Sequence, residues 1–120
     1  MPITTQMTEA CYEAAKSIYP DRTKISEAIK NVCMSTDMND RSARDYIKDF
    51  FSMREGVKLG RCMAEADARY YFEHIHDDYG EEGLATALDS LQAYLDHDHQ
   101  NHPGLQELIN QFRQIVKETR

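Results

Sequence analysis

The sequence predicts an all-α fold, a compact bundle of five to six helices whose first half resembles a helix-turn-helix. Apolar residues recur at intervals of three and four along most of the chain, which is the period of an amphipathic helix. Glycine and proline stand at the ends of these periodic segments. A chain of 120 residues is long enough for one hydrophobic core and too short for two, so we expect a single domain, residues 1–120.

The first half of the chain is expected to hold three helices. Pro20 ends the first helix, because proline restricts the residue before it. Asp21 or Thr23 can cap the second helix, and Asn39 can cap the third. Gly56 suits the left-handed stop that follows a helix. The expected helices are residues 5–19, 23–34 and 40–55.

The second half is expected to hold three longer helices with short joints, which favours antiparallel neighbours. Gly80 closes the first of them, and Pro103 suits the first turn of the last one. In the connector before them, Val57 and Leu59 are expected to pack against the core. The expected helices are residues 63–79, 81–96 and 103–117.

The net charge of −7 is unevenly distributed. Residues 1–60 carry nine basic and nine acidic side chains, whereas residues 61–120 carry five basic and twelve acidic ones. Each contact with a nucleic-acid backbone needs a cation, so DNA binding would have to use the first half. The chain shows no signal-peptide pattern and no apolar run of the roughly 18 residues that a membrane helix needs. We therefore expect a cytoplasmic protein with no membrane partner.

Helices 23–34 and 40–55 together look like a helix-turn-helix, in which the start of the second helix contacts DNA. The expected DNA-binding residues are Arg41, Ser42, Arg44 and Lys48. The loop expected at residues 34–40 is longer than the usual turn and lacks glycine, and Asp40, Asp45 and Asp49 flank the same face. The alternative is a charged helix face that only contacts water.

Three histidines cluster in the polar segment before the last helix. A loop can fold His97, His99 and His102 onto one metal ion, with Asp96 or Asp98 beside them. Imidazole and carboxylate ligands together suit zinc or nickel. The alternative is a polar linker without a metal. Cys11, Cys33 and Cys62 are expected to be reduced and to pack as small apolar side chains, and no cofactor is expected.

Several short sequence segments between Lys24 and Asp96 are similar to those of a known family of helical domains. They are Ser42 to Ile47, Met53 to Gly56, Arg61 to Met63, Tyr71 to Ile75, Asp78 to Leu84 and Ala87 to Leu91. The order resembles the helical domain that precedes the nuclease domain in bacterial McrA-like HNH restriction endonucleases. The His-Asn-His core and Cys-x-x-Cys zinc pairs of that nuclease part do not occur in this sequence, so the resemblance implies no catalytic residue here.

Two hypotheses of function follow. The first is a non-catalytic accessory module, associated with DNA restriction or phage defence, that contacts DNA through helix 40–55. The second is a protein-interaction module with an acidic face, either a homodimer or a docking or inhibitor protein of prophage origin that binds a nuclease-type partner. No Ser/His/Asp order, glycine-rich phosphate loop or metalloprotease motif occurs in the sequence, so we do not expect an enzyme.

Overall fold

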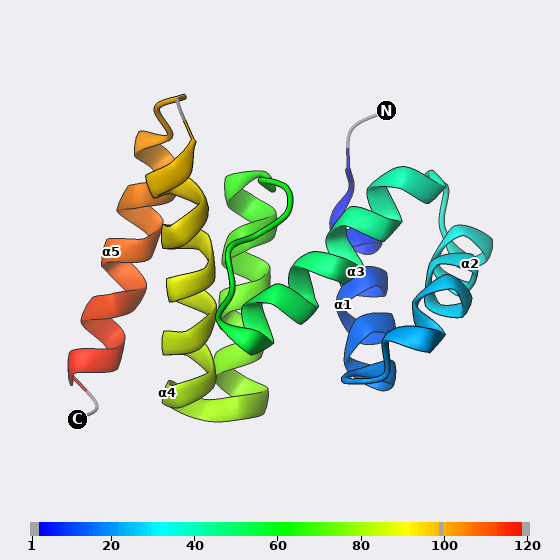
Figure 1. Cartoon of the computed structure of the whole chain (residues 1–120), viewed down its shortest axis with the longest axis horizontal. Coiled ribbons are helices and arrows are strands. Elements are labelled where there is room, and N and C mark those ends of the chain that lie inside the picture. The colour runs from blue at the N-terminus through cyan, green and yellow to red at the C-terminus, as the bar shows by residue number, and fades with distance from the viewer. Residues whose placement is uncertain (1–2, 99, 119–120) are drawn as a thin grey trace. The chain divides into compact units, whose positions relative to one another are not determined.

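The computed structural model describes residues 3–98 and 100–118, and within these ranges the chain forms helices and no strand (Figure 1). The predicted all-α fold class is therefore confirmed. The elements are α1 (Thr5–Ile18), the 3₁₀ turn η1 (Arg22–Lys24), α2 (Ile25–Ser35), α3 (Asp40–Glu55), α4 (Glu65–His97) and α5 (Pro103–Glu118). Among the described helices, none is both long and apolar enough to cross a bilayer.

The chain divides into two compact units, residues 1–51 and 52–120. The boundary falls inside α3, which begins in the first unit and ends in the second. Two compact units of this size can still unfold as one cooperative domain, so the single-domain expectation stays a prediction.

In the first unit, α1 packs against α2, and aromatic side chains join α1 to α3. The Tyr12 ring meets Phe50 edge to face, with 5.3 Å between the ring centroids, and Tyr19 meets Phe51 at 4.9 Å. Tyr12, Phe50 and Phe51 are fully buried. Edge-to-face pairs of this kind add to the free energy gained by burying the rings. These large side chains therefore fix α3 against α1.

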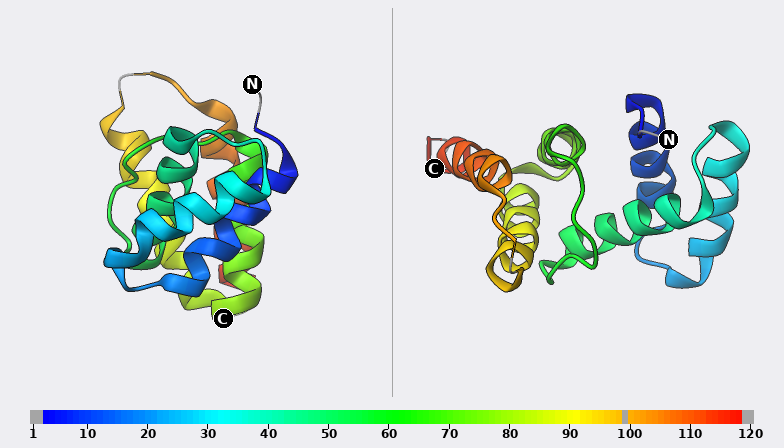
Figure 2. Two further views of the ribbon diagram at one scale, coloured as in Figure 1. Left: turned by 90° about the vertical axis from the view of Figure 1, so that its right-hand side faces the viewer. Right: turned by 90° about the horizontal axis from the view of Figure 1, so that it is seen from above.

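In the second unit, α4 reverses its direction at Gly80, so that its two halves and α5 lie side by side as three antiparallel segments (Figures 1 and 2). Gly80 has φ 75° and ψ −166°, and Gly56 has φ 74°. The predicted helix ends at both glycines are thus confirmed. The two halves of α4 and α5 bury apolar stripes, and Phe72 on α4 meets Phe112 on α5 with 5.4 Å between the ring centroids.

The connector between α3 and α4 differs from the expectation in two ways. Leu59 is buried as predicted, but the prediction for Val57 was wrong, because its side chain is 51% exposed. The hydroxyl of Ser90 donates a hydrogen bond to the Val57 carbonyl, so the backbone of this residue, and not its side chain, is held by α4. α4 begins at Glu65 and not at residue 63, because Ala64 has an extended backbone.

Candidate nucleic-acid interface

Three of the four predicted DNA-binding residues share one exposed face of α3. Arg41, Arg44 and Lys48 follow one another at spacings of three and four, which places them in one row along the helix. All three side chains are exposed. Ser42 lies beside this row and is half-buried. The structure therefore brings the three cations together at a surface that a partner can reach.

The acidic residues that were expected to flank this face differ in their exposure. Asp45 lies four residues after Arg41 and three before Lys48, so it stands on the same side of the helix as these two cations. Asp49 is only 2% exposed and Asp45 is half-buried, whereas Asp40 is exposed. The three cations thus face solvent with one exposed carboxylate, Asp40, within the first nine residues of the helix.

The turn before α3 is shorter than the sequence suggested. α2 continues to Ser35 and α3 begins at Asp40, which leaves a connection of four residues, Thr36 to Asn39. The Asn39 side chain accepts a hydrogen bond from the backbone N–H of Ser42 at 2.9 Å, so it caps α3 and stops the loop there. The prediction of a long loop at residues 34–40 was therefore wrong. The observed turn has the length of three to four residues that is typical of a helix-turn-helix.

The α3 cations differ from several other arginines of the chain in having no internal partner. In the described part of the protein, Arg41, Arg44 and Lys48 make no hydrogen bond, ion pair or ring contact. Other guanidinium groups already have partners. The Cζ atom of Arg22 lies 5.1 Å from the centroid of the Phe51 ring, and that of Arg54 lies 3.6 Å from the centroid of the Tyr79 ring. Arg69 donates a hydrogen bond to Gln111 at 3.4 Å, and Arg113 forms an ion pair with Asp89 at 2.8 Å.

A groove between α2 and α3 adds residues that the sequence reasoning missed. Its volume is about 420 Å³. On the α2 side lie Ser26 and Lys30, four residues apart on one face, and Arg44 lies on the α3 side. The sequence reasoning missed Lys30 because the groove depends on how α2 and α3 approach each other. The lining is completed by Ile29, Cys33, Met34 and Asp40.

Cys33 sits in this groove and remains a thiol. Its Sγ donates a hydrogen bond to Oδ1 of Asp40, with 3.4 Å between the two atoms. Partial burial raises the pKa of the Cys33 thiol, and the hydrogen bond and negative charge of Asp40 raise it further. All three described cysteines are free, and Cys11 is fully buried. Cys33 is therefore a weak nucleophile. Because it lies in the groove, its rate of alkylation depends on whether the groove is open to solvent.

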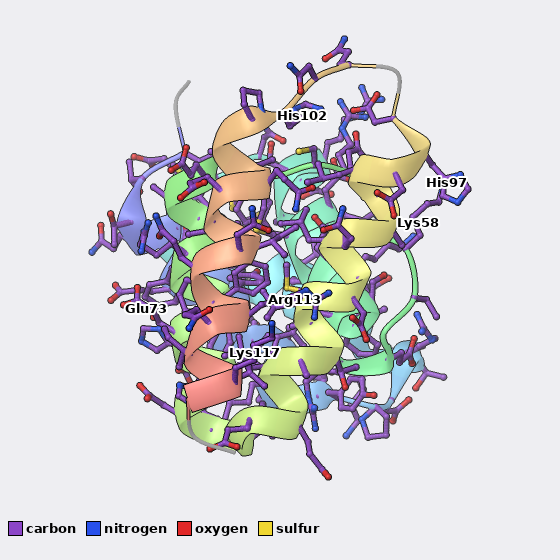
Figure 3. The ribbon with its side chains drawn as sticks, turned by 90° about the vertical axis from the view of Figure 1, so that its left-hand side faces the viewer. Lys58, Glu73, His97, His102, Arg113 and Lys117 are labelled. Atoms are coloured by element: carbon purple, nitrogen blue, oxygen red, sulfur yellow. The ribbon has the colours of Figure 1, made fainter. Side chains whose placement is uncertain are left out.

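The histidines of the α4–α5 turn point in different directions (Figure 3). Nε2 of His102 lies 2.6 Å from Oδ2 of Asp98, at the start of α5. His97 projects outward from the end of α4, beside Lys58. His99 lies outside the described residues, and no group of three metal-ligating side chains occurs among those that are described. The metal site at His97, His99 and His102 stays a prediction.

The comparisons with known proteins add no family to this geometry. No protein-family model matches the chain, and neither the curated proteins nor the solved structures give a significant match. The function is therefore argued from the site itself.

Proposed function

We propose that this chain is a non-catalytic helical module that binds duplex DNA through the exposed face of α3. The observation that supports this most strongly is the row formed by Arg41, Arg44 and Lys48, which are exposed and have no internal partner among the described residues. In a helix-turn-helix, the start of the second helix lies in the major groove. The three cations contact phosphates or guanine edges, and Ser42 contacts a base or a phosphate.

The resemblance to the domain in front of McrA-like HNH nucleases supports an accessory role in restriction or phage defence. In that role the module holds DNA while another protein or domain cleaves it. Because none of the nuclease residues of that family occurs in this sequence, we propose that the module itself is not an enzyme.

A salt titration of duplex binding tests the proposal. Three phosphate contacts predict that the logarithm of the binding constant falls with the logarithm of the salt concentration, with a slope of about −2.7. Fluorescence anisotropy of a labelled duplex between about 50 and about 200 mM salt measures this slope. A binding constant that ignores salt, or no binding at the lowest salt, contradicts the proposal.

The second candidate function is a protein-interaction module, and a hollow between α4 and α5 favours it. The hollow has a volume of about 340 Å³ and is lined in part by Glu73, Asp77 and Phe112. Ile115 stands at this hollow and is 38% exposed, so an apolar side chain is available there to a partner. A homodimer or a docked nuclease-type protein would cover it. Sedimentation of the chain alone and with a candidate nuclease tests this function, and a strictly monomeric species in both samples contradicts it.

A further inference from the structure

Within the first unit, the groove between α2 and α3 has a cation on each wall. Lys30 lies on α2 and Arg44 lies on α3, and the hydroxyl of Ser26 lies one helical turn before Lys30. In the part of the chain that the structure describes, neither cation has a hydrogen bond or an ion pair. Two lysine or arginine side chains and a hydroxyl are the donors that commonly bind a phosphate oxygen.

The acidic residue of the groove does not cancel this charge. Asp40 lies on the α3 side and accepts the hydrogen bond from Cys33 at 3.4 Å. With Lys30 on the opposite wall and Arg44 one turn further along α3, the described lining keeps an excess of one positive charge. The remaining lining of Ile29 and Met34 is apolar, and Met34 is 76% exposed at the rim.

We propose that the groove holds one phosphate of the DNA backbone, bound by Lys30 and Arg44 with Ser26 as a further donor. This inference rests on the proposed DNA binding through α3 and extends the contact surface to α2. Arg44 belongs to both the α3 row and the groove, so a phosphate held here fixes how far α3 enters the major groove. Phosphate contacts of this kind set the register of a protein on DNA without reading its sequence.

The first arm of the test compares Lys30, which lies within α2, with Lys24, which lies just before it. In K30Q the groove loses one wall charge while Arg44 still contacts the phosphate. We therefore expect the salt slope of duplex binding to become less steep, by up to about 1, for any DNA sequence. K24Q is the matched control. Lys24 is also exposed, but it lines the hollow between α1 and α2, together with Glu13 and Glu27. K24Q is expected to keep the slope of the unmodified protein, and thermal unfolding checks that both variants fold.

The second arm uses Cys33 as a probe inside the groove. In a C62A background, Cys33 is the accessible thiol among the described cysteines, because Cys11 is fully buried. A duplex that lies in the groove is expected to slow alkylation of Cys33 by iodoacetamide at least several-fold at an alkaline pH, at which part of the thiol is ionised. A duplex at a salt concentration that abolishes binding is the control and is expected to leave the rate unchanged.

The outcomes separate this inference from the proposed function. A lower slope in K30Q together with slower alkylation of Cys33 supports the phosphate site. If the full chain binds DNA and loses affinity in R41Q and K48Q, while K30Q behaves like K24Q or Cys33 reacts at its free rate, the groove is not a phosphate site and the α3 interface remains. If the duplex does not bind at all, both proposals are wrong.

Discussion

The guanidinium of Arg54, at the end of α3, lies 3.6 Å from the centroid of the Tyr79 ring, just before the reversal of α4. Both side chains are half-buried. Gly83 makes room for this contact, because a Cβ at that position would lie only 2.6 Å from Cβ of Tyr79. A cation over an aromatic face attracts it electrostatically, and partial burial strengthens that attraction. The pair therefore ties α3 to the bend of α4 within the second unit.

A double-mutant cycle measures this contact. We expect R54M and Y79L to be coupled by about 1 kcal/mol, because the leucine keeps apolar volume but lacks the electron-rich face. Urea unfolding of the two single variants, the double variant and the unmodified chain gives the coupling energy. Additive losses within about 0.3 kcal/mol would show that the two side chains are only neighbours.

Replacing Gly80 is expected to destabilise the protein more than replacing another open glycine. Gly80 has φ 75° and ψ −166°, a conformation that is essentially restricted to glycine, so G80A is expected to cost about 1–3 kcal/mol. Nothing lies within 4 Å of a Cβ built there, so the cost is conformational and not steric. G60A is the matched control, since Gly60 is equally open and its φ is not left-handed. Equal melting temperatures for G80A and G60A would contradict this account.

Charge removal on α3 is expected to weaken DNA binding by a similar amount at each position. R41Q and K48Q should each make the salt slope less steep by about 1, because each removes one phosphate contact. K117Q removes the same charge from an exposed position on α5 and serves as the control. Anisotropy titrations at several salt concentrations give the slopes. A loss in K117Q as large as that in R41Q would indicate attraction by overall charge and not by a defined face.

The reactivity of Cys33 is expected to rise when Asp40 loses its charge. Burial is the largest cause of the raised thiol pKa, and the hydrogen bond and charge of Asp40 follow. D40N removes the charge, so the pKa falls toward its ordinary value and a larger thiolate fraction exists at a given pH near 8. Alkylation in the C62A background should therefore be faster in D40N, and its pH profile should shift to lower pH. D37N is the control, because Asp37 is an exposed acid in the loop before α3.

The helices were predictable because their apolar periodicity decides which faces are buried. The row of Arg41, Arg44 and Lys48 follows from the same periodicity, since these residues fall between the buried Ala43, Tyr46 and Ile47. A period alone does not reveal a buried charge, so Asp49 was expected to flank the exposed face although it is almost fully buried.

The groove was not predictable from any one helix. It depends on the closeness of α2 and α3, and this closeness depends on a turn of four residues that begins only after α2 has continued to Ser35. The sequence between Met34 and Asp40 has turn-forming residues throughout, so it gave no signal for the helix end. For the same reason, the sequence did not predict that Lys30 and Arg44 line the same groove.

The abrupt reversal at Gly80 also constrains how this chain can evolve. The two halves of α4 meet at Gly80 with no loop between them, so there is no loop that could accommodate a residue inserted beside the bend. An added residue would turn everything that follows by about 100° around the helix axis. Leu84, Leu88 and Leu91 would then leave the interior together. A change in chain length is therefore not tolerated at the hairpin.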